Sequence, residues 1–299
     1  MKIRQSFGIG LLVTLALVGS GCGSKKKSPD TTSAAAPVDS AAPTESPATA
    51  PPETGAAPAP AAVKTKTAGT LTVCSDIPYA PFEYYENGAD GPVIGIDAEI
   101  VSAAAQGLGL KTEFRKTPFD GIFAALAAGQ CDIIASSVSI TEDRKKSNDF
   151  TDGYFTIHQS ILVRSEDATL NDLSALEGRV VGVQTATTGA DFAKKDAKAD
   201  GYDVKEFAGA DDLIVALKAK QVDAVVQDSP INGYAATKSD GALVVSKVFE
   251  GGGEAYGFVV PKDNPDLTAA LNGTLTTMKS DGRYKTILTK YLGDTAGVA

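Results

Sequence analysis

The sequence predicts an α/β protein whose globular part consists of two related lobes. From residue 69 onward, short apolar runs alternate with segments of helical periodicity, which is typical of parallel sheets with helices on their faces. A segment of the chain also repeats, because DGIFAALAAGQCD (residues 120–132) aligns without a gap on DDLIVALKAKQVD (residues 211–223) with six identities. Two amphipathic helices of similar composition are the alternative explanation. The shared order of helix, turn and strand favours two lobes built on one plan.

The first residues predict export. Lys2 and Arg4 precede an apolar segment from Phe7 to Val18, and small residues then lead to Cys22. This pattern is typical of a signal peptide, and the apolar segment is too short to span a bilayer comfortably. It resembles a bacterial lipoprotein signal, in which the cysteine is diacylated, although Gly19 stands where that pattern prefers leucine. We expect residues 1–21 to be removed, with an ordinary secretory signal cut nearby as the alternative.

Residues 22–68 predict a disordered tether behind the lipidated cysteine. They are rich in Ala, Pro, Thr and Ser and contain eight of the fifteen prolines, so they cannot bury enough apolar surface to offset the entropy of ordering. The formal net charge is −9, and removal of Lys2 and Arg4 lowers it to −11. This acidic balance argues against a nucleic acid as partner.

The first half of the globular part predicts two strands and two helices. Leu71 to Cys74 is an apolar run expected to be a strand. Apolar residues then recur at helical spacing from Ile96 to Leu108, and glycines follow at that end. We expect a second helix over residues 119–128, stopped by Gly129, and a buried strand over residues 132–136.

The second half predicts the same elements again. Residues 179–183 open it as a strand, and the loop of residues 184–189 leads into a helix at Ala190, so its backbone N–H groups suit an anion. The offset of the repeat places Ser137 opposite Asp228, each just beyond the carboxyl end of its strand. Ligands of open α/β sheets bind outside those ends. We therefore expect both residues in one cleft.

Cysteine and histidine usage predicts no metal site and no cofactor. Besides Cys22, only Cys74 and Cys131 remain. A secreted protein could pair them, but the expected strand positions lie farther apart than a disulfide reaches. We therefore expect two buried, unpaired cysteines. His158 is the only histidine, so a transition-metal site is not expected.

Arg144 and Asp228 are the residue types expected for a zwitterionic ligand. Arg144 offers a planar fork of donors that matches a carboxylate, and Asp228 offers a negative charge from the other half of the chain. Two alternatives stay open at this point. Arg144 could be a surface residue paired with Glu142 or Asp143, and Asp228 could cap the turn before Pro230.

Five segments in order carry a resemblance to a known family. They are GTLTVCSDIPYAPFEY, GIDAEIVSAAAQGLG, FDGIFAALAAGQCDIIASSVSITEDR, FTDGYF and VVGVQTATTGADF. Together they resemble the polar amino-acid substrate-binding lipoproteins of ABC importers, extracellular solute-binding proteins of family 3, over residues 69–292. The resemblance implies a two-lobed periplasmic-binding-protein-like fold, each lobe a mixed sheet flanked by helices, joined by two crossing strands. Lobe 1 would comprise residues 69–158 and 253–299, and lobe 2 residues 159–252.

The resemblance also implies the ligand contacts. Arg144 would hold the α-carboxylate with the backbone N–H groups of Ser139 and Thr188, and Asp228 would hold the α-ammonium with Ser139 and the carbonyl of Ser137. The expected ligand-binding residues are Asp76, Tyr79, Phe119, Ser136, Ser137, Ser139, Arg144, Gln184, Thr188 and Asp228. Tyr79 and Phe119 would sandwich the ligand side chain, and Asp76, Ser136 and Gln184 would lie toward its far end. Ala186 departs from the family's usual glycine in the anion loop.

The function implied is capture of a polar amino acid between two closing lobes and its delivery to the membrane subunits of an ABC importer. Asp76 favours a basic side chain first and glutamine second. We expect a monomer, lipid-anchored to the outer face of the cell membrane, with no catalytic residue. The alternative is an enzyme of the same fold, such as a dehydratase or a lytic transglycosylase. The only nearby carboxylates for catalysis would be Glu83, Glu86 and Asp76.

Overall fold

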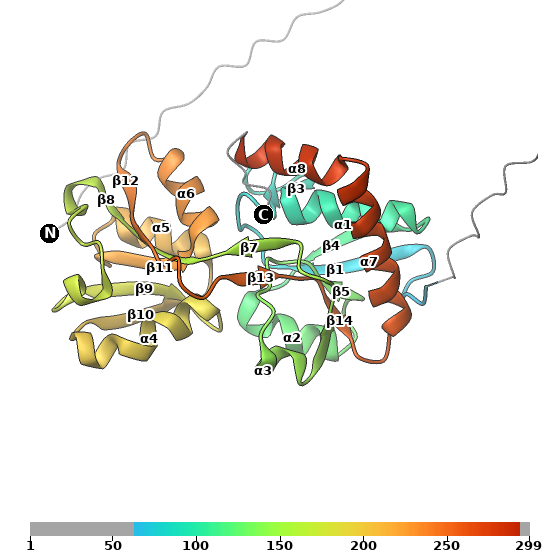
Figure 1. The fold of residues 1–299 in the computed structure, drawn as a ribbon, viewed down its shortest axis with the longest axis horizontal. Helices are drawn as coiled ribbons and strands as arrows, with labels where there is room; N and C mark the ends of the chain where they lie inside the picture. Colours follow the sequence, from blue (N-terminus) through green and yellow to red (C-terminus); the bar gives the residue numbers. More distant parts are fainter. Residues whose placement is uncertain (1–62, 294–299) are drawn as a thin grey trace, which may run out of the picture. The chain divides into compact units, whose positions relative to one another are not determined.

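The computed structural model describes residues 63–293. The predicted signal peptide, Cys22 and most of the predicted tether lie outside these residues. The described chain contains two separate five-stranded sheets, each with helices on its faces (Figure 1), and two short two-stranded sheets, β2-β3 and β7-β13. We call the two five-stranded sheets, with their helices, the first lobe and the second lobe.

The first lobe contains a mixed sheet in the order β4-β1-β5-β14-β6. Strands β4, β1 and β5 are parallel, whereas β14 is antiparallel to both β5 and β6. Its elements are β1 (Thr70–Ser75), β2 (Tyr84–Tyr85), β3 (Val93–Ile94), α1 (Ile96–Gly107), β4 (Lys111–Lys116), α2 (Phe119–Ala127), β5 (Ile133–Ile134), α3 (Glu142–Lys145), β6 (Asn148–Phe150), β14 (Val259–Pro261), α7 (Pro265–Ser280) and α8 (Arg283–Leu292).

The second lobe repeats this plan in the order β10-β9-β11-β8-β12. Strands β10, β9 and β11 are parallel, and β8 runs antiparallel between β11 and β12. Its elements are β8 (Gln159–Arg164), η1 (Ser165–Asp167), η2 (Leu173–Leu176), β9 (Val180–Gln184), α4 (Thr188–Asp200), β10 (Asp203–Phe207), α5 (Ala210–Lys218), β11 (Ala224–Asp228), α6 (Ser229–Thr237) and β12 (Leu243–Val248).

The chain crosses between the lobes on two strands. Strands β7 (Phe155–Ile157) and β13 (Glu254–Tyr256) pair antiparallel and lie side by side between the two sheets (Figure 1). His158 is the single residue between β7 and β8. The first lobe is therefore completed by the C-terminal part of the chain, which returns on β13.

The repeated segments form the same reciprocal pair of hydrogen bonds in both lobes. The N–H of Asp132 donates to the carbonyl of Thr72, whose N–H donates back to the Asp132 carboxylate, both at 2.8 Å. Asp223 and Val180 exchange the equivalent pair of bonds at 2.7 and 2.9 Å. Each aspartate thus connects the turn after a helix to a strand of its lobe, β1 in the first lobe and β9 in the second. This shared contact supports the interpretation of residues 120–132 and 211–223 as a structural repeat.

Apolar side chains pack on both faces of each sheet. In the first lobe, α1, α7 and α8 bury residues such as Ile100 and Leu271 against one face, and α2 buries Ile122 and Leu126 against the other. In the second lobe, α4 and α5 take the equivalent places on opposite faces. The sheets are thereby covered, and their carboxyl edges carry the polar residues described below.

Cys74 and Cys131 form a disulfide, so the prediction of unpaired cysteines was wrong. Their Cα atoms are 5.7 Å apart. The prediction placed Cys131 next to a strand beginning at residue 132, but β5 begins only at Ile133 and the chain bends at Asp132. That bend returns Cys131 toward β1, where both cysteines are buried with the α2 side chains.

Residues 63–68, whose composition placed them in the tether, contact the first lobe. Val63 packs against the apolar core, and the N–H of Lys66 donates to the Asp132 carboxylate at 2.7 Å. Composition did not indicate this contact because its partner lies far along the chain. Among the described residues, no helix has both the length and the apolar character needed to cross a membrane.

Candidate functional site

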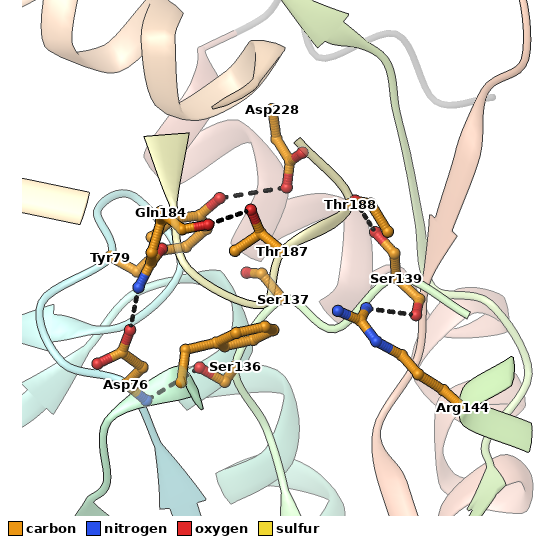
Figure 2. A pocket seen from close by; sticks show the side chains of 11 residues that line it. Asp76, Tyr79, Ser136, Ser137, Ser139, Arg144, Gln184, Thr187, Thr188 and Asp228 are labelled. Carbon is orange, nitrogen blue, oxygen red and sulfur yellow. Dashed lines mark hydrogen bonds between the residues drawn. The ribbon is translucent and has the colours of Figure 1, made fainter. Parts of the chain in front are cut away.

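A small cavity lies between the two lobes. All ten residues expected to bind the ligand line this cavity, and Thr187 lines it as well (Figure 2). The ten are Asp76, Tyr79, Phe119, Ser136, Ser137, Ser139, Arg144, Gln184, Thr188 and Asp228. Four of the lining residues lie at or just after the carboxyl ends of parallel strands: Asp76 follows β1, Ser136 follows β5, Gln184 ends β9 and Asp228 ends β11. This is the expected position for a ligand in an open α/β sheet.

Arg144 is held in place at one end of the cavity by the backbone of both lobes. Its Nη1 donates to the carbonyl of Ser139 at 2.9 Å and its Nη2 to the carbonyl of Ala186 at 3.1 Å. Its guanidinium also lies over the rings of Phe119 and Phe123, with 5.5 and 5.4 Å to their centroids. These contacts leave the guanidinium positive and oriented beside the cavity.

The alternative pairing of Arg144 with neighbouring acids is not found. Glu142 accepts from Lys145 at 3.0 Å, and Asp143 accepts from Lys146 at 2.6 Å. The two lysines therefore neutralise the acids on the exposed side of α3. Burial lowers the pKa of Arg144, while Glu254 and Asp228 oppose that shift. An arginine stays protonated despite such a shift.

The loop before α4 brings a helix N-terminus to the same end of the cavity. Thr187 is the N-cap residue, and its hydroxyl accepts from the N–H of Ala190 at 3.1 Å and donates to the carbonyl of Gln184 at 2.8 Å. Ala186 adopts a left-handed backbone with φ 64°, a conformation that glycine adopts more freely. Thr188 opens the helix and its hydroxyl lies 3.5 Å from that of Ser139. The positive end of the helix dipole and Arg144 together favour an anion there.

Asp228 provides the opposite charge from the second lobe. Its Oδ2 accepts from the hydroxyls of Tyr79, at 3.2 Å, and Tyr256, and its Oδ1 accepts from Nε2 of Gln159 at 2.6 Å. Burial raises the pKa of Asp228 to about 6, although these hydrogen bonds oppose the rise. Its side chain makes no capping bond to α6, so the alternative role in the turn before Pro230 was wrong.

Asp76 marks a third place around the cavity, away from Arg144 in Figure 2. Its Oδ2 accepts from Nε2 of Gln184 in the second lobe at 2.6 Å, and its N–H donates to the hydroxyl of Ser136 at 2.9 Å. Burial raises the pKa of Asp76 to about 6, and the Gln184 bond opposes the rise. Near neutral pH this carboxyl group is largely ionised and can accept donors from a ligand side chain.

A pair of carboxyl groups lies behind the serines of the cavity wall. Glu83 and Asp97 are both 0% exposed. The hydroxyl of Ser136 donates to Glu83 at 2.9 Å, and the N–H of Ser137 donates to Asp97 at 2.7 Å. Ser137 has a left-handed backbone with φ 49°, which these contacts hold. Burial raises the pKa of Asp97 to about 7 and that of Glu83 well above its usual value.

The aromatic residues divide between the cavity and the core. Tyr79 and Phe119 line the cavity, whereas Phe82, favoured as a core residue, is completely buried in the first lobe. Phe82 packs edge to face against Phe155 and Tyr256. The crossing strands are thereby joined to the core of the first lobe.

Four residues at or behind the cavity were missed from the expected contacts. Thr187 could have been found, since a threonine immediately before a helix is the usual N-cap. Gln159, Tyr256 and Asp97 lie behind the cavity residues and carried no local signal, because only the folded chain brings them to Asp228 or Ser137. The described residues contain no cluster of three or more His, Cys, Asp or Glu side chains that could hold a metal ion.

Comparison with known proteins assigns the family. The model of the bacterial extracellular solute-binding proteins, family 3, matches residues 71–294. A probable histidine-binding protein of Neisseria gonorrhoeae is 32% identical over 228 residues, covering 76% of this chain and 84% of that protein. An ancestral arginine-binding protein, solved bound to arginine, is 36% identical with a TM-score of 0.71 and covers 75% of this chain and 99% of its own. An ancestral arginine-binding protein solved bound to glutamine is 35% identical with a TM-score of 0.70, over 76% of this chain and 100% of its own. The chain therefore belongs to the bacterial extracellular solute-binding proteins, family 3.

Proposed function

We propose that this protein captures a basic amino acid, arginine first, between its two lobes and delivers it to an ABC importer. The observation that carries the proposal is the placement of three charges around one cavity: Arg144 at one place, Asp228 at another and Asp76 at a third. An α-amino acid with a cationic side chain carries the complementary three charges. The relatives named as histidine-binding and arginine-binding proteins support this ligand class.

Arg144 and the start of α4 are proposed to hold the α-carboxylate. The guanidinium is already oriented by two backbone carbonyls, so little side-chain entropy is lost when it pairs with a carboxylate. The N–H groups of Ser139 and Thr188 would complete the site. Because Ser139 belongs to the first lobe and Thr188 to the second, one carboxylate would contact both lobes.

Asp228 is proposed to hold the α-ammonium with the Ser137 carbonyl and the Ser139 hydroxyl. The left-handed backbone of Ser137 is needed for this, because the direction of its carbonyl depends on that conformation. Asp97 and Glu83 hold Ser137 from behind through its N–H and hydroxyl. The ammonium would therefore also meet groups from both lobes.

Asp76 is proposed to read the ligand side chain, which Tyr79 and Phe119 would sandwich. A guanidinium or ammonium group would find an acceptor in Asp76, with the Ser136 hydroxyl and Gln184 amide beside it. Glutamine is the second ligand we propose, because an amide can donate to the same carboxylate. The ancestral arginine-binding protein solved bound to glutamine supports glutamine as a second ligand.

Closure of the lobes is proposed as the mechanism of capture. Strands β7 and β13 are the two connections, so His158 and Gly253 beside them are the proposed hinge positions. A ligand shifts an equilibrium between open and closed forms only if it binds the closed form better. Arg144 in one lobe and Asp228 in the other supply that difference. Closure would then present surface from both lobes to the transporter's membrane subunits.

We propose that the cavity serves binding rather than catalysis. Of the carboxylates considered for an enzyme, Glu83 is buried behind Ser136 and Ser137, and Glu86 is exposed and outside the cavity lining. Asp76 remains, and its partner across the cavity is the amide of Gln184 and not a second acid.

Calorimetric titration tests the proposal directly. The mature chain with Cys22→Ser would be unfolded and refolded without reductant, which strips carried-over ligand and keeps the Cys74–Cys131 bond. It is then titrated with arginine, lysine, ornithine, histidine, glutamine, citrulline and the other amino acids. We expect one-site binding of arginine that is much tighter than binding of citrulline, its neutral isostere. Equal affinity for the two would contradict a charge-reading Asp76, and no binding of any amino acid would contradict the function.

We further propose that Cys22 anchors the protein to the membrane and that residues 23–62 form the tether. Cells labelled with a fatty-acid analogue should yield labelled protein from the wild type and none from Cys22→Ser. The variant should also appear in the culture medium or periplasm. Unchanged labelling would contradict lipidation at this residue.

A further inference from the structure

Gln159 contacts the groups proposed for both ends of the ligand. It is the first residue of β8, is 5% exposed and pairs with Asp228 in the antiparallel register of β8 and β11. Its Nε2 lies 2.6 Å from Oδ1 of Asp228 and 3.4 Å from both Oγ1 of Thr188 and Oε1 of Glu254. One amide group therefore lies among the ammonium site, the start of α4 and the crossing strand β13.

The orientation of this amide is determined by its partners. A carboxylate oxygen only accepts hydrogen bonds, so Asp228 requires the NH₂ side of Gln159. The Oε1 atom is consequently turned away, toward Gly189, where an added Cβ would approach it to 2.9 Å. Among the described residues, no group donates a hydrogen bond to that oxygen. An unsatisfied buried oxygen costs stability, so the contact with Asp228 is maintained against a local penalty.

The other donors to Asp228 leave Oδ1 to Gln159. Tyr79 and Tyr256 both donate to Oδ2. Without Gln159 the carboxylate would lose its bond at Oδ1 and with it the constraint on rotation about its terminal bond. A hydrogen bond to a charged group is stronger than one between neutral groups.

We propose that Gln159 is the positioning residue that orients Asp228 and links it by hydrogen bonds to Thr188 and Glu254. The sites for the α-ammonium and the α-carboxylate of an amino acid are thereby held in a fixed relation to each other. This inference rests on the proposed function, because it assigns the ammonium to Asp228. Gln159 itself does not line the cavity. It acts through Asp228, and it connects that residue to the strand on which the lobes are joined.

The test measures the arginine dissociation constant of wild type, Gln159→Leu and Ser160→Ala from pH 5.5 to 8. Leucine keeps the bulk of the side chain and removes the amide. We expect a loss of about tenfold to a hundredfold at pH 8, the effect of one hydrogen bond to a charged group. Ser160 is the matched control: it is the next residue of β8, is buried, and its hydroxyl donates to the Gln227 carbonyl at 2.9 Å away from the cavity.

The pH profile separates positioning from a general structural role. The hydrogen bond from Gln159 lowers the pKa of Asp228, whereas burial and Glu254 raise it. Tyr79 and Tyr256 also donate hydrogen bonds to Asp228, and Arg144 of α3 is the nearby cation. Removing the bond raises that pKa, and only ionised Asp228 attracts the ammonium. The ratio of the Gln159→Leu to the wild-type constant should therefore grow as pH falls from 8 to 6, while the Ser160→Ala ratio stays constant.

Each result decides the matter. A Gln159→Leu profile parallel to that of the wild type would overturn the positioning role, and so would an affinity equal to the wild type. With 5-guanidinopentanoate, which is arginine without its α-amino group, we expect a clearly smaller loss in the variant. If Gln159→Leu does not fold, Gln159→Asn takes its place as the test variant, because the side chain is one methylene shorter and its amide no longer reaches Asp228. A wild type that binds no amino acid would remove the proposed function instead, before the variants are compared.

Discussion

Arg144 is the residue on which the proposed carboxylate site depends most. Truncation to alanine would leave a ligand carboxylate buried without its cation, a loss on the order of 3–5 kcal/mol. We expect the dissociation constant of arginine to rise by roughly two to four decades in Arg144→Ala. Titration calorimetry measures it, with Arg283→Ala as control, since Arg283 pairs with Asp281 on the surface of α8. Near-native affinity in Arg144→Ala would remove the carboxylate assignment.

Asp76 is expected to discriminate between ligand side chains. Its carboxylate accepts from Gln184 on one oxygen, and the Asp76→Asn variant keeps an amide oxygen but loses the charge. We therefore expect this change to weaken arginine binding more than glutamine binding, by at least tenfold in the ratio of the two constants. Because burial raises the pKa of Asp76 to about 6, wild-type arginine affinity should also rise between pH 5 and pH 7. Equal losses for the two ligands would show that Asp76 does not read the side chain.

At the scale of single residues, the sequence predicted those whose position follows from strand and motif. Ser137 follows β5 and Asp228 is the last residue of β11, and both line the cavity. Gln159 and Asp97 were not predicted, because nothing near them in the chain indicates their partners. The left-handed backbones of Ser137 and Ala186 were also beyond a sequence argument, since both residues usually avoid that conformation. Contacts across the fold stabilise them there.

At the scale of elements, hydrophobic periodicity predicted the helices well. Helices α1 and α2 begin at the expected residues, Ile96 and Phe119, and α2 ends one residue early, before Gly129 with φ 70°. Strand β5 is shorter than expected at both ends, because the chain bends at Asp132 and the strand ends at Ile134 instead of Ser136. This bend depends on the hydrogen bonds between Asp132 and Thr72, which are 60 residues apart in the sequence. The wrong prediction for the cysteines follows from the same bend.

The disulfide is expected to stabilise the first lobe by joining β1 to the turn between α2 and β5. Its sequence separation of 57 residues corresponds to about 4 kcal/mol of lost loop entropy in the unfolded chain. The double variant Cys74→Ala/Cys131→Ala should therefore lower the free energy of unfolding by roughly this amount in urea titrations. Reductant should destabilise the wild type similarly and leave the double variant unchanged. A loss below about 1 kcal/mol would contradict a stabilising role.

At the scale of the whole molecule, the two lobes meet through polar contacts around the cavity. Gln184 donates to Asp76, Tyr79 donates to Asp228, and Arg144 donates to the Ala186 carbonyl. Each of these bonds joins the first lobe to the second with a residue of the proposed ligand site. Closure and binding therefore depend on the same side chains, and a change to any of them should alter both.

The stability of the whole molecule should depend on the protonation of Asp97. Its folded pKa is about 7 against a usual 3.8, because burial penalises the charge. A raised carboxyl pKa contributes stability that is complete below the unfolded value and is lost as pH rises through the folded value. The free energy of unfolding of the ligand-free wild type, minus that of Asp97→Asn, should therefore fall between pH 4.5 and pH 7.5 in urea titrations. Asp281→Asn is the control. Arg283 lowers the pKa of Asp281, so the free energy of unfolding of the wild type minus that of Asp281→Asn should stay constant over this range. A flat difference for Asp97→Asn would mean that this carboxyl group is already ionised at pH 4.5, and that the serines of the cavity wall rest on a charged group.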